Sequence, residues 1–218
     1  MIPKIIHQVW AGPMVAGIQK CLDSVKRHNP DCDIRLYGSE DLRPDIPGSF
    51  SLVAATDILR HQKLFEEGGY YIDADCYCFK SLDFNRSVTF GQQEPSDHPS
   101  DLVEWAMGSE AGHPLLESLL KATLENVSTK PYNGYAAQKE LARWGMSGGN
   151  TVSHEWAGSR YFAKVNRSFV QPKSPTLVHL FLTSWVTVTK VNLPYIAGWP
   201  KVLNVANELE KVLTFRKD

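Results

Sequence analysis

The sequence predicts an α/β sandwich built on a largely parallel sheet. Strand-like and helix-like segments alternate through the first 125 residues, which is the order that βαβ units require. The pair Gly68-Gly69 separates a helical segment from a strand, because glycine adopts the left-handed helix-ending conformation at little cost. That strand runs into Asp73 and Asp75, and ligands of such sheets bind at the carboxyl ends of strands. The fold class therefore also predicts where a site should lie.

Hydrophobic periodicity divides the chain into elements. Apolar residues at steps of three and four predict helices over residues 15–28 and 51–67 and a third helix that begins at His113-Pro114. Apolar alternation or continuous apolar runs predict strands. The predicted strands are residues 4–10, 34–37, 70–73, 88–91 and 177–182.

The pattern weakens beyond residue 128. Residues 144–150 resemble a loop, and the final segment is compatible with a helix or a frayed end. No internal repeat or low-complexity linker occurs, so residues 1–218 are expected to form one domain.

Composition narrows the classes of function. A formal net charge of −1 gives no global basic field for nucleic acid or an anionic membrane. The beginning of the chain lacks the pattern of a signal peptide, and no apolar run approaches the roughly 18 residues that span a bilayer. We therefore expect a cytoplasmic protein without a membrane span. The four cysteines do not form a disulfide pattern and are expected to be free thiols.

Asp73 and Asp75 lie in the stretch "GGYYIDADCYC", in which the sequence places no Lys or Arg nearer than Lys63 or Lys80. On extended backbone the two side chains would share a face, with the small Ala74 between them. Two close carboxylates either take up a proton or are neutralised by a cation, and Mg²⁺ or Mn²⁺ suits carboxylate oxygens. The alternative is an ordinary loop with two solvated aspartates.

Four segments resemble a known family. The stretch "ATDILRHQKLFEEGGYYIDADCYCFKSLD", residues 55–83, resembles the DXD-containing sugar-binding region of glycosyltransferases. That family includes yeast-type initiating mannosyltransferases and bacterial capsular and lipopolysaccharide sugar transferases, with large clostridial toxin glucosyltransferase domains as distant relatives. The segments "IPKIIHQVW", "MGSEAGHPLLESLL" and "HLFLTSW" resemble the opening strand, the next segment and the late motif of the same family.

The resemblance implies a GT-A fold, a single Rossmann-like α/β/α sandwich, and a UDP- or GDP-sugar donor. It implies a donor- and metal-binding half at residues 1–125 and an acceptor-side half at 126–218. It also implies a retaining transfer assisted by Mn²⁺ or Mg²⁺, in which the leaving diphosphate takes the acceptor proton.

The resemblance assigns roles to individual residues. Asp57, Arg60 and Asp75 would be catalytic, and Asp73, Asp75 and His179 would hold the metal. The donor would be bound by His7, Gln8, Trp10, Tyr71, Asp73, Ser184 and Trp185.

Two departures from the family pattern concern the acceptor side and the helix of Asp57. Thr56 stands where the family has Ser, and it keeps the hydroxyl. The usual Thr-Gly-Pro is absent, and Ser147-Gly148-Gly149-Asn150 is a candidate for its place. The acceptor is therefore open: a glycan, a lipid-linked sugar, a protein side chain or a hydroxylated nucleobase, although long nucleic acid is not expected.

Each assignment has a structural alternative. Asp57 and Arg60, three apart on a helix, could form a surface ion pair of small energy. Trp10, His7 and His179 could be core residues. The sequence around Lys80 and Arg35 gives no indication of a functional role for either residue. A polar cluster on a predicted loop is best explained by solvation, with acceptor contact as the alternative; its members are Glu94, Asp97, His98, Asp101 and Glu104.

Two other functions compete with glycosyl transfer. A nucleotidyltransferase would also use paired aspartates and a divalent ion, but no clear phosphate-binding loop accompanies them here. A non-catalytic sugar- or metal-binding module would bind donor without turnover.

Overall fold

The computed structural model describes residues 1–12, 14, 16–43, 51–92, 102–129, 135–146, 152–153, 156–157 and 177–179. The helices are α1 (Ala16–His28), the 3-10 turn η1 (Ser39–Asp41), α2 (Ser51–Glu67), α3 (Pro114–Thr129) and α4 (Tyr135–Met146). The strands are β1 (Ile5–Val9), β2 (Asp33–Tyr37), β3 (Gly69–Ile72), β4 (Cys76–Cys78), β5 (Val88–Gln92), β6 (Leu102–Ser109), β7 (Val152–Ser153), β8 (Trp156–Ala157) and β9 (Leu177–His179).

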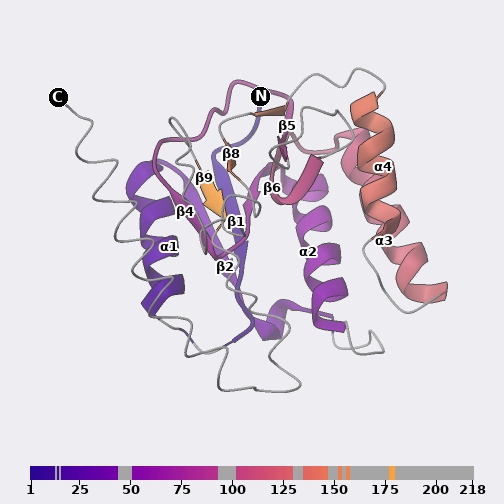
Figure 1. Ribbon diagram of the computed structural model, residues 1–218, viewed down its shortest axis with the longest axis horizontal. Coiled ribbons are helices and arrows are strands. Elements are labelled where there is room, and N and C mark those ends of the chain that lie inside the picture. The colour runs from indigo at the N-terminus through magenta and orange to yellow at the C-terminus, as the bar shows by residue number, and fades with distance from the viewer. Residues whose placement is uncertain are drawn as a thin grey trace, which may run out of the picture.

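A six-stranded sheet in the order β2-β1-β3-β6-β5-β7 forms the centre of the fold (Figure 1). β1 pairs in parallel with both β2 and β3, as the sequence predicts for successive βαβ units. β6 runs antiparallel to both of its neighbours, so the sheet is mixed rather than parallel throughout. A second, smaller sheet has the strand order β4-β9-β8.

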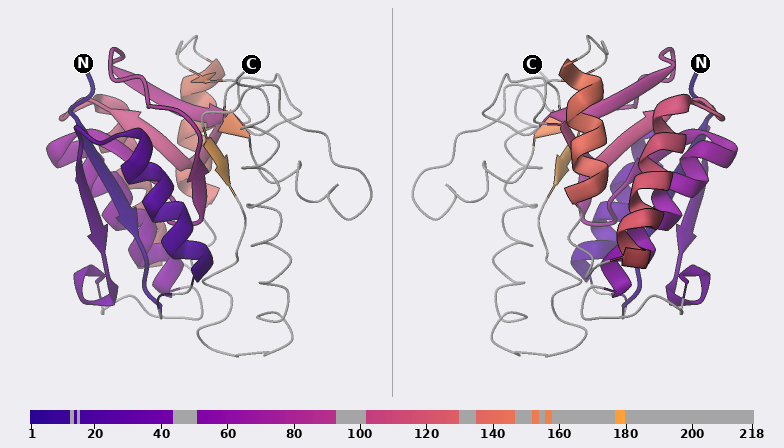
Figure 2. Two further views of the ribbon diagram at one scale, coloured as in Figure 1. Left: turned by 90° about the vertical axis from the view of Figure 1, so that its left-hand side faces the viewer. Right: turned by 90° about the vertical axis from the view of Figure 1, so that its right-hand side faces the viewer.

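Helices cover both faces of the large sheet. α1 lies on one side, and α2, α3 and α4 lie on the other (Figures 1 and 2). Two buried clusters fill the layers between helices and sheet, one around Ile6 and Val25 and the other around Tyr71, Leu116 and Leu141. The α/β/α sandwich expected from the sequence is therefore confirmed.

The described part of the chain differs from the sequence prediction after β3. The elements that were not predicted are β4, β6, α4, β7 and β8, and α4 includes Trp144 to Met146, which we expected to be loop. All four cysteines are free, as expected. Among the described residues, no helix combines the length and apolarity needed to cross a membrane.

Candidate active site

A cleft opens where β1 and β3 end, beside the first half of α2. The residues that line it are Val9, Trp10, Ala11, Gly12, Leu52, Thr56, Arg60, Tyr71, Asp73, Ala74 and Asp75. The sheet therefore places the aspartate pair and Trp10 together, because β1 and β3 are parallel and end at one edge.

Asp73 and Asp75 both line this cleft, but on a turn rather than on extended backbone. The amide of Cys76 donates to the carbonyl of Asp73 at 2.9 Å and closes the turn between β3 and β4. The expected face-sharing by alternation is thus wrong, although both residues still line the cleft. Asp75 is the more buried residue, with 5% of its surface exposed.

Arg60 supplies the positive charge that the local sequence around the aspartates lacks. Its Nη2 lies 2.9 Å from Asp57 Oδ1 and 3.6 Å from Asp73 Oδ1. Arg60 and Asp57 are 4% and 7% exposed, so the alternative of a surface ion pair is wrong. Burial lowers the pKa of Arg60, but Tyr71, Asp57 and Asp73 together raise it by more, and the guanidinium stays charged.

Tyr71 connects Arg60 with Asp73. Its hydroxyl donates to Asp73 Oδ1 at 2.7 Å, and the Arg60 guanidinium lies 4.6 Å from the centre of its ring. Burial raises the pKa of Tyr71 well above its ordinary value, so the hydroxyl remains a donor. The carboxylate of Asp73 is therefore oriented from one side by a neutral donor and from another by a cation.

Acidic groups dominate the charge of this cleft. Among the described residues that line it, one guanidinium, that of Arg60, accompanies two carboxylates, those of Asp73 and Asp75, which leaves a formal charge of 1 − 2 = −1. Two cleft-lining carboxylates match the usual protein contribution to an Mg²⁺ or Mn²⁺ site that also uses substrate phosphates. The described residues contain no group of three His, Cys, Asp or Glu side chains arranged for a metal. The pair fits a substrate-shared ion better than an all-protein cage.

Trp10 lines the cleft beyond the end of β1, as the resemblance implies. Gly12 lies under its ring, and a Cβ on Gly12 would be 3.7 Å from the indole. The sequence did not single out Val9, Ala11, Gly12 or Leu52, because apolar and small cleft residues carry no pattern that separates them from core.

His7 and Gln8 lie away from the cleft. They are 0% and 1% exposed and are not among the described residues that line it, so their donor contacts stay a prediction. Both ring nitrogens of His7 have protein partners, whereas neither amide atom of Gln8 has one among the described residues. Asp57 also lies behind the cleft wall and acts on the cleft through Arg60.

His179 is placed by strand pairing. Antiparallel β4 and β9 put its backbone opposite Cys76, the residue after Asp75, which is compatible with the expected role as a third ligand. Ser184, Trp185, the Ser147–Asn150 segment and the polar residues 93–101 lie outside the described residues.

Glu104 lies on β6 and not on the solvated loop that we expected. Its Oε2 lies within hydrogen-bond distance of His61 Nε2, at 3.0 Å, and its carbonyl accepts from Arg60 Nη1 at 3.0 Å. His61 is fully buried and also contacts Thr123 Oγ1 at 3.2 Å. β6 is thus fixed to α2 beside Arg60, a contact with no local signal in the sequence.

The architecture of the chain, with its cleft at the ends of β1 and β3, is of the GT-A type found in glycosyltransferases. A solved structure described as "PaToxG Glycosyltransferase" superposes with a TM-score of 0.51 at 16% identity, covering 68% of this chain and 70% of that one. At this identity the similarity shows the fold alone. The GT-A fold implied by the sequence resemblance is therefore confirmed.

Two curated relatives extend the similarity to sequence. Inositol phosphoceramide mannosyltransferase 3 of Schizosaccharomyces pombe is 29% identical over 136 residues, which cover 55% of this chain and 36% of the relative. Inositol phosphoceramide mannosyltransferase 2 of the same organism is 28% identical over 147 residues, covering 59% and 40%. No family model matches the chain. The chain resembles glycosyltransferases, as the sequence predicts, and the matches span well under half the length of these relatives.

Proposed function

We propose that this protein is a metal-dependent retaining glycosyltransferase that moves a sugar from a nucleotide-diphosphate sugar to an acceptor hydroxyl. The observation that carries the proposal is the group formed by Asp73, Asp75, Arg60 and Tyr71 in one cleft of a GT-A fold. A structural domain would gain little from burying such a group, since a buried ion pair is seldom a net source of stability.

Asp73 and Asp75 are the residues that would hold Mn²⁺ or Mg²⁺ together with the donor diphosphate, with His179 as a candidate third ligand. When bound, such an ion stabilises the negative charge that develops on a diphosphate leaving group. Tyr71 donates to Asp73 and so orients that carboxylate beside the cleft.

Arg60 has two tasks in this scheme. Its ion pair with Asp57 fixes the guanidinium on the cleft wall, and its charge faces the diphosphate or a donor-sugar hydroxyl. A cation held before the reaction stabilises leaving-group charge without the cost of reorganisation. Trp10 offers a flat apolar surface for the nucleobase at the other end of the cleft.

Retention of anomeric configuration follows from the family resemblance, and the leaving diphosphate is the proposed acceptor of the hydroxyl proton. The names of the mannosyltransferase relatives favour mannose as the donor sugar and a lipid-linked or glycan hydroxyl as the acceptor. A hydroxylated nucleobase is a less favoured acceptor. A cytoplasmic location of the protein stays a prediction.

The test is a donor panel with Mn²⁺ and without acceptor, in which release of nucleoside diphosphate is measured. The panel contains UDP-glucose, UDP-galactose, UDP-N-acetylglucosamine and GDP-mannose. Two comparisons accompany the wild type: Asp75→Asn, and Asp23→Asn as a control that makes the same change at an exposed position of α1.

We expect slow release from one donor, lost with EDTA and in Asp75→Asn but retained in Asp23→Asn. Incorporation of the nucleotide rather than the sugar would instead establish a nucleotidyltransferase. Donor binding without release, even when candidate acceptors are added, would indicate a binding module and contradict the proposal.

A further inference from the structure

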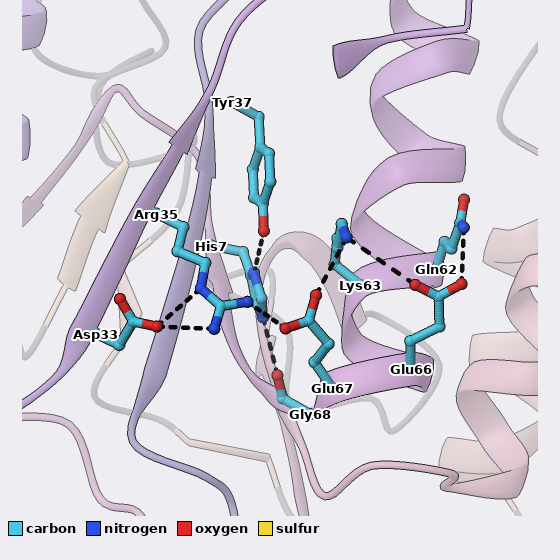
Figure 3. Close-up of polar contacts among 9 residues, drawn as sticks. All are labelled: His7, Asp33, Arg35, Tyr37, Gln62, Lys63, Glu66, Glu67 and Gly68. Atoms are coloured by element: carbon cyan, nitrogen blue, oxygen red, sulfur yellow. Dashed lines mark hydrogen bonds and ion pairs between the residues drawn. The ribbon is translucent and has the colours of Figure 1, made fainter.

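His7 lies on β1 beside Gly68, at the junction between α2 and β3 (Figure 3). Arg60 lies on α2, and Asp73 directly follows β3. The His7 side chain is fully buried. Nε2 lies 2.9 Å from the carbonyl oxygen of Gly68, and Nδ1 lies 3.0 Å from the hydroxyl of Tyr37 on β2. One imidazole thus bridges β2 and the α2–β3 junction from within β1.

The chemistry of the two partners fixes the tautomer of His7. A backbone carbonyl can only accept, so Nε2 must carry the hydrogen that bonds to Gly68. In the neutral ring Nδ1 is then an acceptor, and it takes the hydroxyl hydrogen of Tyr37. Every polar atom of the ring is satisfied in this one state.

The junction that His7 holds is sterically tight. Gly68 and Gly69 have φ values of +68° and +101°, which side-chain-bearing residues rarely adopt. A Cβ on Gly68 would lie 2.7 Å from the amide nitrogen of Ala111, and one on Gly69 would lie 2.5 Å from the carbonyl oxygen of Ile5. Because the backbone has no spare room here, a fixed Gly68 carbonyl also fixes where α2 ends and β3 begins.

Charged groups surround the outer side of His7. Arg35 on β2 pairs with Asp33 and with Glu67, and Glu67 also accepts from Lys63 on α2 at 3.1 Å (Figure 3). These ion pairs are partly exposed, and such pairs contribute little to the free energy of unfolding. Burial is the main cause that lowers the pKa of His7; Glu67 opposes the shift, while Arg35 and Lys63 reinforce it.

We propose that His7 is a positioning residue that holds the Gly68 carbonyl and thereby sets the placement of Arg60 and Asp73 in the cleft. The catalytic part of this inference rests on the proposed function. Arg60 lies two helical turns before Gly68, and Tyr71 and Asp73 follow it by three and five residues, so a shift at the junction displaces both walls of the cleft.

Two near-isosteric variants separate the two hydrogen bonds. In His7→Gln, the terminal amide nitrogen can occupy the Nε2 position and donate to Gly68. In His7→Asn, the shorter amide reaches only the Nδ1 position, so the contact to Tyr37 survives and the contact to Gly68 is lost. Tyr37→Phe is the matched control, because it removes the hydroxyl that contacts Nδ1 of His7, together with that hydroxyl's contact to Arg35, and keeps the contact between His7 and Gly68.

Two readouts are independent of turnover. Nitrogen-15 NMR of labelled histidines should find His7 neutral and protonated at Nε2 at pH 7, with the resonance identified by its loss in His7→Gln. Amide hydrogen exchange of the peptide over residues 64–72 should be about tenfold faster or more in His7→Asn, and within about threefold of wild type in His7→Gln and Tyr37→Phe.

The kinetic readout uses the donor identified by the panel. We expect kcat of His7→Asn to fall between about tenfold and a hundredfold with little change in KM, because small displacements of catalytic groups act mainly on the transition state. His7→Gln should recover to within about threefold of wild type.

Equal exchange and kinetics in the Asn and Gln variants, or an Nδ1-protonated ring in the wild type, would overturn the proposal. If the wild type turned over no donor, the proposed function would fail, while the NMR and exchange results would still decide whether His7 holds the junction.

Discussion

Because the ion pair between Asp57 and Arg60 is buried, removal of one partner should lower the free energy of unfolding more than the same change in an exposed ion pair. At about 4 Å between charge centres and an effective dielectric of about 20, the attraction is about 4 kcal/mol. Loss of hydration offsets much of it, but removal of one partner leaves the other charge buried at a side-chain exposure of 4% or 10%. Arg60→Gln should therefore destabilise the protein by about 3–5 kcal/mol.

A double-mutant cycle isolates the coupling. The free energy of unfolding in urea is measured for wild type, Arg60→Gln, Asp57→Asn and the double variant, and the double should be less destabilised than the sum by about 1.5–3 kcal/mol. Asp83 and Arg86 provide the control, since they are the same residue types at the same spacing, 3.1 Å apart, with side chains 52% and 40% exposed. Their coupling should be under about 1 kcal/mol. Equal coupling energies in the two cycles would show that burial does not strengthen the coupling between Asp57 and Arg60.

Three further predictions follow from the same geometry. Gly69→Ala should lower the free energy of unfolding by at least about 2 kcal/mol in urea titrations, because φ is +101° and the new Cβ meets Ile5; a smaller loss would contradict the tight junction. Trp10→Ala should weaken nucleoside diphosphate binding about tenfold by calorimetry, and Trp10→Phe should restore most of it; equal affinities would exclude stacking. The pKa of His7 is lowered from 6.5 in the folded protein, so its contribution to stability is present above about pH 6.5 and is lost as the pH falls toward the folded pKa. His7→Gln should therefore reduce the slope of the free energy of unfolding against pH in this range. An unchanged slope would contradict the lowered pKa.

The sequence predicted the elements whose pattern is local. α1, α2 and α3 have regular apolar spacing, and the stop at Gly68-Gly69 is required by two positive φ values. α4 was missed because its apolar stripe is narrow: Ala137, Leu141 and Trp144 follow helical spacing but supply about one apolar residue per turn, and the helix packs on α3. Its weak apolar stripe becomes a core face only when α3 is present.

β6 and the groups around Arg60 show the limit of local reasoning about the site. Glu104 seemed to belong to a solvated polar cluster, yet it lies in a buried strand because His61, 43 residues earlier, satisfies its carboxylate. His7 seemed equally suited to core or donor contact, and its two partners, Tyr37 and Gly68, are 30 and 61 residues away. Pairings of this kind depend on the tertiary fold, so residue types and spacing could not predict them.

In the proposed function, Asp75 belongs to a site that binds a metal ion and a nucleotide together. Calorimetric titration of UDP and GDP into the protein, with Mn²⁺ and with EDTA, tests it without requiring an acceptor. We predict binding of one nucleotide only in the presence of Mn²⁺, at least tenfold weaker in Asp75→Asn and unchanged in Asp23→Asn, since loss of a charged ligand costs about 1.4 kcal/mol or more. Nucleotide binding that is indifferent to EDTA and equally tight in Asp75→Asn would contradict the account.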